Sequence, residues 1–466
     1  MLKLFATSSL VVLSAGATLS LAAPDLFGPA ASAQSVRASD TLVLDAASRD
    51  ALLSLASGVR GERAERLIAE NWSPAWIPAT FETLNFIGSD AARRELVART
   101  ALHTGVNHGA DTNAWFRWLW NQPEMRVEGL ADYKADLYRE IDPRFRRYFE
   151  GRGEQRTIRL DEIRWGGVRQ DGIPPLRRPK MLRASDADYL DDGDVVFGIE
   201  VNGDVRAYPK RILAWHEMFV DEVGGTEFAG VYCTLCGTVI LYEAAGHDLG
   251  TSGFLYRSNK LMYDRKTQSL WNTLTGEPVV GPLVGQGVKL DHRSVVTTTW
   301  GKWRELHPDT QVLSLDTGHR RDYREGVAYH DYFATDELMF NTPFSDRRLD
   351  NKQEVLALRL PGARGKPLAV SADYLRERPV WHGEQGGVSF VVLTDETGAN
   401  RVYAPKGVQF TRFDGAREAV DADGTRWRVE EARLTAPDGR ELPRLPYHRA
   451  FWFGWQAAYP DTELVR

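Results

Sequence analysis

The sequence predicts an α+β protein in which a helical N-terminal region is followed by two related β-rich units. Three observations predict this fold class. Apolar residues recur with helical spacing over residues 39–150. After that region, short runs of alternating apolar and polar residues, separated by turn signals, are typical of strands. Residues 161–330 and 331–466 share an ordered series of short motifs, which predicts an internal duplication.

The first 33 residues have the pattern of a secretory signal peptide. Lys3 supplies a positive charge, an apolar stretch rich in small residues follows, and Ala31-Ser32-Ala33 matches a cleavage site. We expect Gln34 to begin the mature chain. No later stretch is long and apolar enough to span a bilayer. The mature protein is therefore expected to be periplasmic or secreted, where a pair of cysteines can be oxidised.

Composition and charge narrow the classes of function. The chain has 466 residues, a net charge of −6 and 26% charged residues, and it contains no dense run of Lys and Arg. Nucleic-acid binding usually needs a basic field, so the sequence argues against it. The chain also lacks a phosphate-binding glycine loop, a dinucleotide fingerprint and the common zinc-protease and hydrolase motifs. No nucleotide cofactor is expected.

The region 39–150 is predicted to contain five or six helices. Asp45 and Ser48 stand before the apolar run Leu52–Leu55, which is a helix start signal. The stretches 71–74 and 105–109 contain turn residues and are predicted breaks. The other segments with helical spacing lie near 60–71, 90–103, 112–121 and 128–148.

Residues 161–330 are predicted to form the first β-rich unit. Residues 194–201 and 205–208 flank an Asn-Gly turn, which is a strong hairpin signal. Residues 228–232 and 238–242 read as two strands joined by the turn Cys233-Thr-Leu-Cys236-Gly237. A further pair of strands, near 262–265 and 269–271, is expected around a polar turn.

The second unit, residues 331–466, repeats motifs of the first in the same order. Trp300-Gly-Lys-Trp303 and its following Pro-Asp-Thr recur 152 residues later, and Trp271 recurs as Trp427 after 156. Two further matches are Gly224-Gly225 with Gly386-Gly387 and Trp215-His216 with Trp381-His382, at offsets of 162 and 166. On this alignment the cysteine turn corresponds to the polar turn 394–398. The scaffold therefore does not need the two thiols.

Cys233 and Cys236 are the only cysteines in the chain and can serve four purposes. They can hold a metal ion, cycle between dithiol and disulfide, supply a nucleophile, or staple the turn. One such turn supplies two ligands, so a zinc or copper site needs others, and His216 is the predicted third ligand. A redox pair is usual at a helix start, whereas a strand is predicted here. A disulfide across this turn closes a very small loop.

A second polar cluster, Tyr263-Asp264-Arg265, lies in the same unit. Asp264 could orient a ligand or act as a base, and Arg265 could hold an anionic substrate. Ser252 and the run Arg257-Ser258-Asn259 could line the same cleft. Cys233, Cys236, Asp264 and Arg265 are thus the candidate catalytic residues, with Cys233, Cys236 and His216 as candidate metal ligands.

The β-rich part of the chain contains an ordered series of motifs: Asp171-Gly-Ile-Pro-Pro175, Arg206-Ala-Tyr-Pro209, Trp215-His-Glu217, Tyr232-Cys-Thr-Leu-Cys-Gly237, Gly253-Phe-Leu-Tyr-Arg-Ser-Asn259, Met262-Tyr-Asp-Arg265 and Gly281-Pro-Leu283. In these motifs the chain resembles a family of exported bacterial and archaeal proteins, domain of unknown function 3179, over about residues 165–466. The resemblance implies no settled activity. Thr234 stands where the family has Pro after the first Cys, so a stiffening ring is absent from this turn.

Two hypotheses of function follow from the sequence. In the first, an exported protein carries a metal-thiolate or thiol-redox site at Cys233 and Cys236, and enzymatic activity is left open. In the second, the chain is a non-catalytic periplasmic binding or assembly module whose thiols form a structural disulfide. The expected partner is an unknown small molecule or a periplasmic protein.

Overall fold

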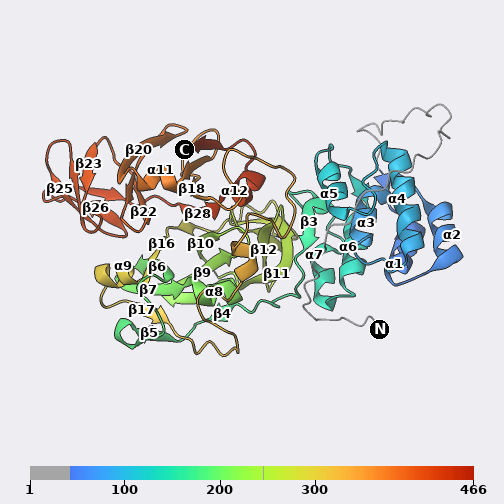
Figure 1. Ribbon diagram of the computed structural model, residues 1–466, viewed down its shortest axis with the longest axis horizontal. Coiled ribbons are helices and arrows are strands. Elements are labelled where there is room, and N and C mark those ends of the chain that lie inside the picture. The colour runs from blue at the N-terminus through green and yellow to red at the C-terminus, as the bar shows by residue number, and fades with distance from the viewer. Residues whose placement is uncertain (1–41, 245) are drawn as a thin grey trace, which may run out of the picture.

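The computed structural model describes residues 42–244 and 246–466, which combine helices with several short sheets (Figure 1). The mixed fold class is confirmed. The predicted signal peptide, residues 1–33, lies outside the described residues. Within the described ranges, no helix has the length and apolar character needed to cross a membrane.

Two of the N-terminal helices begin or end at signals that the sequence carries. The Asp45 side chain accepts the Ser48 amide at the start of the first helix, and Gly105, at φ 73°, ends the fourth. The elements are β1 (Leu42–Val43), α1 (Ala46–Ala56), α2 (Gly61–Asn71), α3 (Trp76–Thr83), α4 (Asp90–Thr104), α5 (Thr112–Trp120), β2 (Val127–Glu128), α6 (Leu130–Tyr138), η1 (Pro143–Phe145) and α7 (Arg146–Phe149).

Two parts of this region differ from the prediction. Helix α3 was not predicted, because all eight of its residues are buried and it therefore has no polar face to give a helical period. The segment 128–148, predicted as one helical stretch, is divided into α6, η1 and α7. The division falls at Pro143, which cannot continue a helix from within.

The helices share a hydrophobic core with the first sheet that follows them. Phe254 inserts among aromatic rings of the helical region and lies 4.8 Å from the Phe145 ring and 4.9 Å from the Tyr138 ring. The buried Lys134 donates to the carbonyl of Ile163 at 2.8 Å. The helical region is thus packed directly on the β structure, as Figure 1 shows at its right-hand side.

Residues 163–313, called here the first β region, contain three five-stranded sheets. Their strand orders are β14-β13-β12-β11-β3, β15-β10-β9-β8-β4 and β16-β6-β7-β17-β5. The elements are β3 (Ile163–Trp165), β4 (Leu176–Arg177), β5 (Met181–Arg183), β6 (Val195–Val201), β7 (Asp204–Pro209), α8 (Lys210–His216), β8 (Met218–Val223), β9 (Thr226–Cys233), β10 (Thr238–Glu243), β11 (Leu249–Tyr256), β12 (Asn259–Asp264), β13 (Leu270–Asn272), β14 (Glu277–Val280), β15 (His292–Arg293), β16 (Val296–Thr299), α9 (Trp300–Leu306) and β17 (Gln311–Leu313), with the short helices η2 (Leu160–Glu162) and η3 (Ala184–Asp186) beside β3 and β5.

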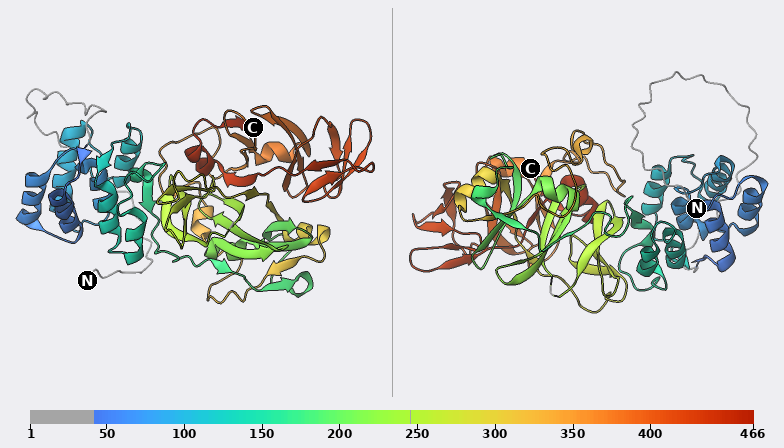
Figure 2. Two further views of the ribbon diagram at one scale, coloured as in Figure 1. Left: turned by 180° about the vertical axis from the view of Figure 1, so that it is seen from behind. Right: turned by 90° about the horizontal axis from the view of Figure 1, so that it is seen from below.

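Residues 354–465, called here the second β region, contain three further sheets in the orders β28-β18-β19-β29, β20-β21-β22 and β23-β24-β25-β26-β27. The elements are β18 (Glu354–Leu358), β19 (Leu368–Ser371), α11 (Ala372–Arg376), β20 (Val380–Gln385), β21 (Val388–Thr394), β22 (Asn400–Tyr403), β23 (Phe410–Phe413), β24 (Glu418–Asp421), β25 (Arg426–Val429), β26 (Arg433–Thr435), β27 (Glu441–Pro443), β28 (His448–Phe451), α12 (Trp452–Ala458) and β29 (Glu463–Val465). The two β regions lie side by side in the views of Figures 1 and 2.

One sheet in each region has the same pattern of pairing. Strands β16, β6 and β7 pair antiparallel in that order, and β17 joins β7 in parallel. Strands β28, β18 and β19 do the same, and β29 joins β19 in parallel. The repeated tryptophans lie in α9 and α12: Trp303 donates to Thr310 at 3.0 Å, and Trp455 donates to Thr462 at 2.9 Å.

The repeated glycine pairs form the β8–β9 and β20–β21 turns, but the fourth predicted match differs between the regions. His216 ends α8, whereas His382 lies within β20. These two Trp-His pairs therefore do not occupy matching elements.

The segment 314–353 joins the two β regions and contains no strand. Its one helix is α10 (His330–Phe333). The predicted boundary between units, at 330/331, falls inside this helix. The segment packs over the cysteine turn and so belongs to the surroundings of the candidate site.

Candidate functional site

The cysteine turn joins β9 to β10, as predicted, and Cys233 pairs across the ladder with Thr238. Cys233 and Cys236 form a disulfide, with their Cα atoms 5.4 Å apart. Since the chain has only these two cysteines, it contains no free thiol in this state.

Gly237 allows the turn to press against the second β region. Its φ of +57° is unfavourable for other residues, and a Cβ atom there would lie 2.7 Å from the Phe451 ring. The Phe451 amide donates to the Cys236 carbonyl at 2.7 Å. On the other side, a Cβ atom on Gly454 in α12 would lie 2.8 Å from the Cys236 Cβ. The turn therefore packs against β28 and α12.

The disulfide is buried among apolar side chains. Cys233 is 3% exposed and Cys236 is 0% exposed. The segment 314–353 covers the turn, and Tyr332 from α10 donates to the Leu235 carbonyl at 2.7 Å. The apolar residues around the two cysteines are Leu235, Leu255, Tyr329, Tyr332, Phe333, Leu338, Phe340, Phe451 and Phe453.

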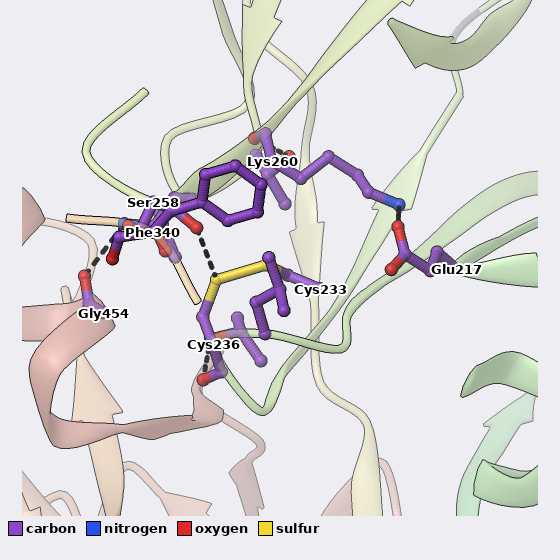
Figure 3. The surroundings of a disulfide bond; sticks show 12 residues. Glu217, Cys233, Cys236, Ser258, Lys260, Phe340 and Gly454 are labelled. Atoms are coloured by element: carbon purple, nitrogen blue, oxygen red, sulfur yellow. Dashed lines mark hydrogen bonds and ion pairs between the residues drawn. A yellow bond between two sulfur atoms is a disulfide. The ribbon is translucent and has the colours of Figure 1, made fainter. Parts of the chain in front are cut away.

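The β11–β12 turn lies beside the disulfide. Arg257 and Ser258 both have positive φ, at 50° and 64°, which costs roughly 1–2 kcal/mol for each non-glycine residue. The Ser258 carbonyl lies 3.5 Å from the Cys236 sulfur (Figure 3). Arg257 is held by two hydrogen bonds to Glu162, at 2.7 and 3.0 Å. Surrounding contacts therefore fix this strained turn beside the sulfurs.

A buried ion pair lies in the surroundings of the disulfide, with the Lys260 ammonium directed away from the sulfurs (Figure 3). Lys260 and Glu217 are 6% and 4% exposed, and the Lys260 ammonium contacts the Glu217 carboxylate (Figure 3). Burial lowers the pKa of Lys260, and the charge of Glu217 opposes that shift. Sequence reasoning missed Lys260, because nothing in the local pattern distinguishes it from a surface lysine.

His216 is not grouped with the two sulfurs. Its Nδ1 lies 2.9 Å from the Pro174 carbonyl and its Nε2 lies 2.6 Å from the Tyr323 hydroxyl. Burial lowers its pKa to about 4, so the ring is neutral at pH 7. Across residues 42–244 and 246–466, no group of three His, Cys, Asp or Glu residues is placed to hold a metal ion. The zinc or copper ion at Cys233, Cys236 and His216 stays a prediction without an assembled ligand set.

Asp264 and Arg265 lie at the far end of β12 from the disulfide. Strand β12 begins at Asn259, beside the sulfurs, and its rise places Asp264 about 16 Å along the strand. The Asp264 carboxylate accepts from the Thr267 amide at 2.7 Å and from the Trp271 indole at 3.2 Å. Arg265 pairs with Asp171 at 2.8 Å. Asp264 holds the β12–β13 turn, whereas Arg265 ties that turn to the distant Asp171, and the structure brings neither side chain to the cysteines.

A cavity of about 260 Å³ lies beside the cysteine turn, between the two β regions. Tyr232 and Gly237, which flank the disulfide, form part of its wall. Its charged lining residues are Lys210, Arg376, Arg449 and Glu354. We call it the turn cavity. None of these four charged residues carried a sequence signal, because they meet only through long-range packing.

Comparison with known proteins gives one match. The family described as "Protein of unknown function (DUF3179)" matches residues 170–462. No curated protein and no solved structure matches the chain.

The close contact between the cysteine turn and Phe451 predicts how much stability is lost when Gly237 is replaced. Gly237→Ala should lower the free energy of unfolding by about 3 kcal/mol, since it adds a steric clash to the cost of a positive φ. Gly439→Ala is the matched control, with φ +85° and no atom within 4 Å of the new Cβ, and should cost only about 1 kcal/mol. Urea denaturation measures both. Equal losses would show that Phe451 does not press on the turn.

Proposed function

We propose that this chain, which belongs to the DUF3179 family of proteins of unknown function, is an exported binding module with a structural disulfide. Its ligand in this proposal is a small anion that enters the turn cavity. The observation that carries the proposal is the position of the disulfide turn, which forms a wall of a cavity lined by three cations and one carboxylate.

The charges around the turn cavity favour an anion. Arg449 pairs with Glu354 and holds the pKa of that carboxyl below its usual range, with Lys210 and Arg376 adding to the effect. Among the described residues, no carboxylate lies within 4 Å of the Lys210 ammonium. That ammonium lies 4.7 Å from the centre of the Phe333 ring. Lys210 is therefore available to pair with a ligand.

We infer that the two β regions are copies of one unit, in which the cysteine turn corresponds to the turn 394–398. A comparison of these two turns supports a bracing role for the disulfide. In the second region, Asp395 accepts from the Thr397 amide at 2.9 Å and from the Ala399 amide at 3.1 Å. A carboxylate thus holds one turn as the disulfide holds the other. Thr397 and Gly398 line the turn cavity opposite Gly237, so both turns meet there.

Burial supports the same role. Reactive cysteines usually lie in exposed electropositive sites, whereas buried ones are inert. The disulfide closes a loop of four residues, so its effect on chain entropy is small. Its contribution in this proposal is to fix the shape of the cavity wall.

A thiol–disulfide centre is the second candidate function, and Lys260 is the observation that favours it. A cation beside a cysteine stabilises the thiolate and makes it more reactive. In this alternative a dithiol reductant attacks one sulfur and forms a mixed disulfide. Its second thiol then displaces the protein sulfur, which leaves two protein thiols and an oxidised reductant.

The binding proposal predicts that inorganic phosphate binds to the protein. Lys210→Met should weaken this binding about tenfold, because the loss of one charge-assisted contact costs roughly 1.4 kcal/mol of binding free energy. Isothermal titration calorimetry measures the affinity. Lys180→Met, which removes an exposed lysine paired with Asp316, is the control and should leave the affinity unchanged. Absence of phosphate binding, or equal loss in both variants, would contradict the proposal.

The two candidate functions differ in how the folded protein responds to dithiothreitol. A structural disulfide should resist reduction until the protein is unfolded, because both sulfurs are buried. Alkylation followed by mass spectrometry counts the thiols with and without urea. Rapid reduction of the folded protein, slowed by Lys260→Met, would instead establish the thiol–disulfide centre.

A further inference from the structure

A second and larger cavity lies between the two β regions, away from the cysteine turn. Its volume is about 480 Å³. His292 from β15 and Thr275 from the first β region line one side, and His448 from β28 and Arg359, which follows β18, line the other. We call it the histidine cavity. Nothing in the proposed function uses these residues.

The two histidines present unused hydrogen-bonding atoms. Their ring centres lie 5.6 Å apart. His448 is 2% exposed, and neither of its ring nitrogens has a partner among the described residues. The Nε2 of His292 also lacks one. Buried polar atoms without partners are costly, so a buried imidazole at a cavity wall points to a polar ligand.

The charges around the histidines favour a negative ligand. Burial lowers the pKa of both rings, to about 4 for His292, and the positive charge of Arg359 lowers both further. The rings are therefore neutral at pH 7 and can each donate one N–H. Within the described residues, no carboxylate lies within 4 Å of the Arg359 guanidinium. A cation would be repelled by this guanidinium, whereas an anion would be attracted.

The other ionisable groups near the cavity do not offset the positive charge of Arg359. Lys289 already pairs with Glu277 at 2.9 Å. Asp291 is exposed to solvent at the cavity edge. The Tyr242 hydroxyl donates to the Thr273 carbonyl at 2.7 Å. Arg359 donates to the Leu274 carbonyl at 3.5 Å and lies over the Tyr459 ring, so among the described residues its positive charge has no carboxylate partner.

A third cavity, of about 230 Å³, lies at the place that corresponds to the histidine cavity in the inferred repeat. It is lined by Glu200, His307, Arg401 and Glu431. The Glu431 carboxylate accepts from Arg401 at 2.7 Å and from Arg444 at 3.0 Å. This cavity therefore contains a carboxylate that the protein itself supplies.

The register of the inferred repeat relates these two cavities. Pairing of Val195 with Thr299 and of Glu354 with Phe451 places Glu200 in correspondence with Arg359. The match of Trp271 with Trp427 likewise places Thr275 in correspondence with Glu431. The histidine cavity thus has a hydroxyl where its counterpart has a carboxylate, and a cation where its counterpart has an acid.

We propose that the histidine cavity binds a small carboxylate ligand, which takes the role that Glu431 has in the corresponding cavity. Its oxygens accept from the Arg359 guanidinium and from the N–H groups of His292 and His448. This inference rests on the repeat register but not on binding at the turn cavity.

Titration with succinate, against chloride at equal ionic strength, tests this proposal. We expect succinate to bind and Arg359→Met to weaken binding at least tenfold. Arg412→Met, an exposed arginine elsewhere on the second β region, should leave the affinity unchanged. Lys210→Met should also leave it unchanged, which separates this site from the turn cavity.

A nitrogen NMR measurement on the unaltered protein provides a second readout that no folding defect can affect. Succinate should shift the imidazole ¹⁵N resonances of His292 and His448, because their ring atoms gain a partner. Succinate binding that survives Arg359→Met, or leaves these resonances unmoved, would overturn the proposal. So would an absence of succinate binding, or a shift of the same resonances by zinc but not by succinate.

Discussion

The contact between the cysteine turn and the second β region is the constraint on which the rest of the site depends. One hydrogen bond, from the Phe451 amide to the Cys236 carbonyl, joins the cysteine turn to a strand more than 200 residues later in the sequence. Gly237 and Gly454 permit the close approach, since each would clash if it carried a side chain. This contact buries the sulfurs and shapes one wall of the turn cavity. The position of the disulfide is therefore fixed by the meeting of the two β regions.

The same contact bears on the role of the disulfide. The sulfurs are covered by aromatic residues, and the ligand predicted to complete a metal site, His216, is engaged with Pro174 and Tyr323. Lys260, the cation that favours sulfur chemistry, is already paired with Glu217. A turn of the second β region is held instead by a carboxylate, that of Asp395.

Local features of the sequence predicted much of the fold. The strands around Cys233 and the turn at Asn202 depend on neighbouring residues, and each is present in the structure. Helix α3 was missed because burial on all sides removes the polar face on which helix prediction depends. The family was predicted from ordered motifs, and the match to residues 170–462 confirms it.

The candidate site was predicted only in part, because its composition depends on long-range packing. Ser258 and Asn259 were expected near a functional cleft and do lie beside the disulfide. Asp264 and Arg265 were expected with them, but an intervening strand carries these residues to its opposite end. The lining of both cavities comes from β28 and its neighbours as well as from the first β region. No local pattern reveals which lysine or histidine such packing will enclose.

Hydrogen exchange at the Phe451 amide tests most directly whether the disulfide holds the turn against the second β region. The comparison is between the oxidised protein and the double variant Cys233→Ser/Cys236→Ser, with the His307 amide, bonded to the Trp303 carbonyl at 2.8 Å, as an internal reference. If the disulfide holds the turn, the Phe451 amide should lose at least tenfold of its protection from exchange in the double variant, while the His307 amide keeps its protection. Unchanged protection at Phe451 would contradict the account.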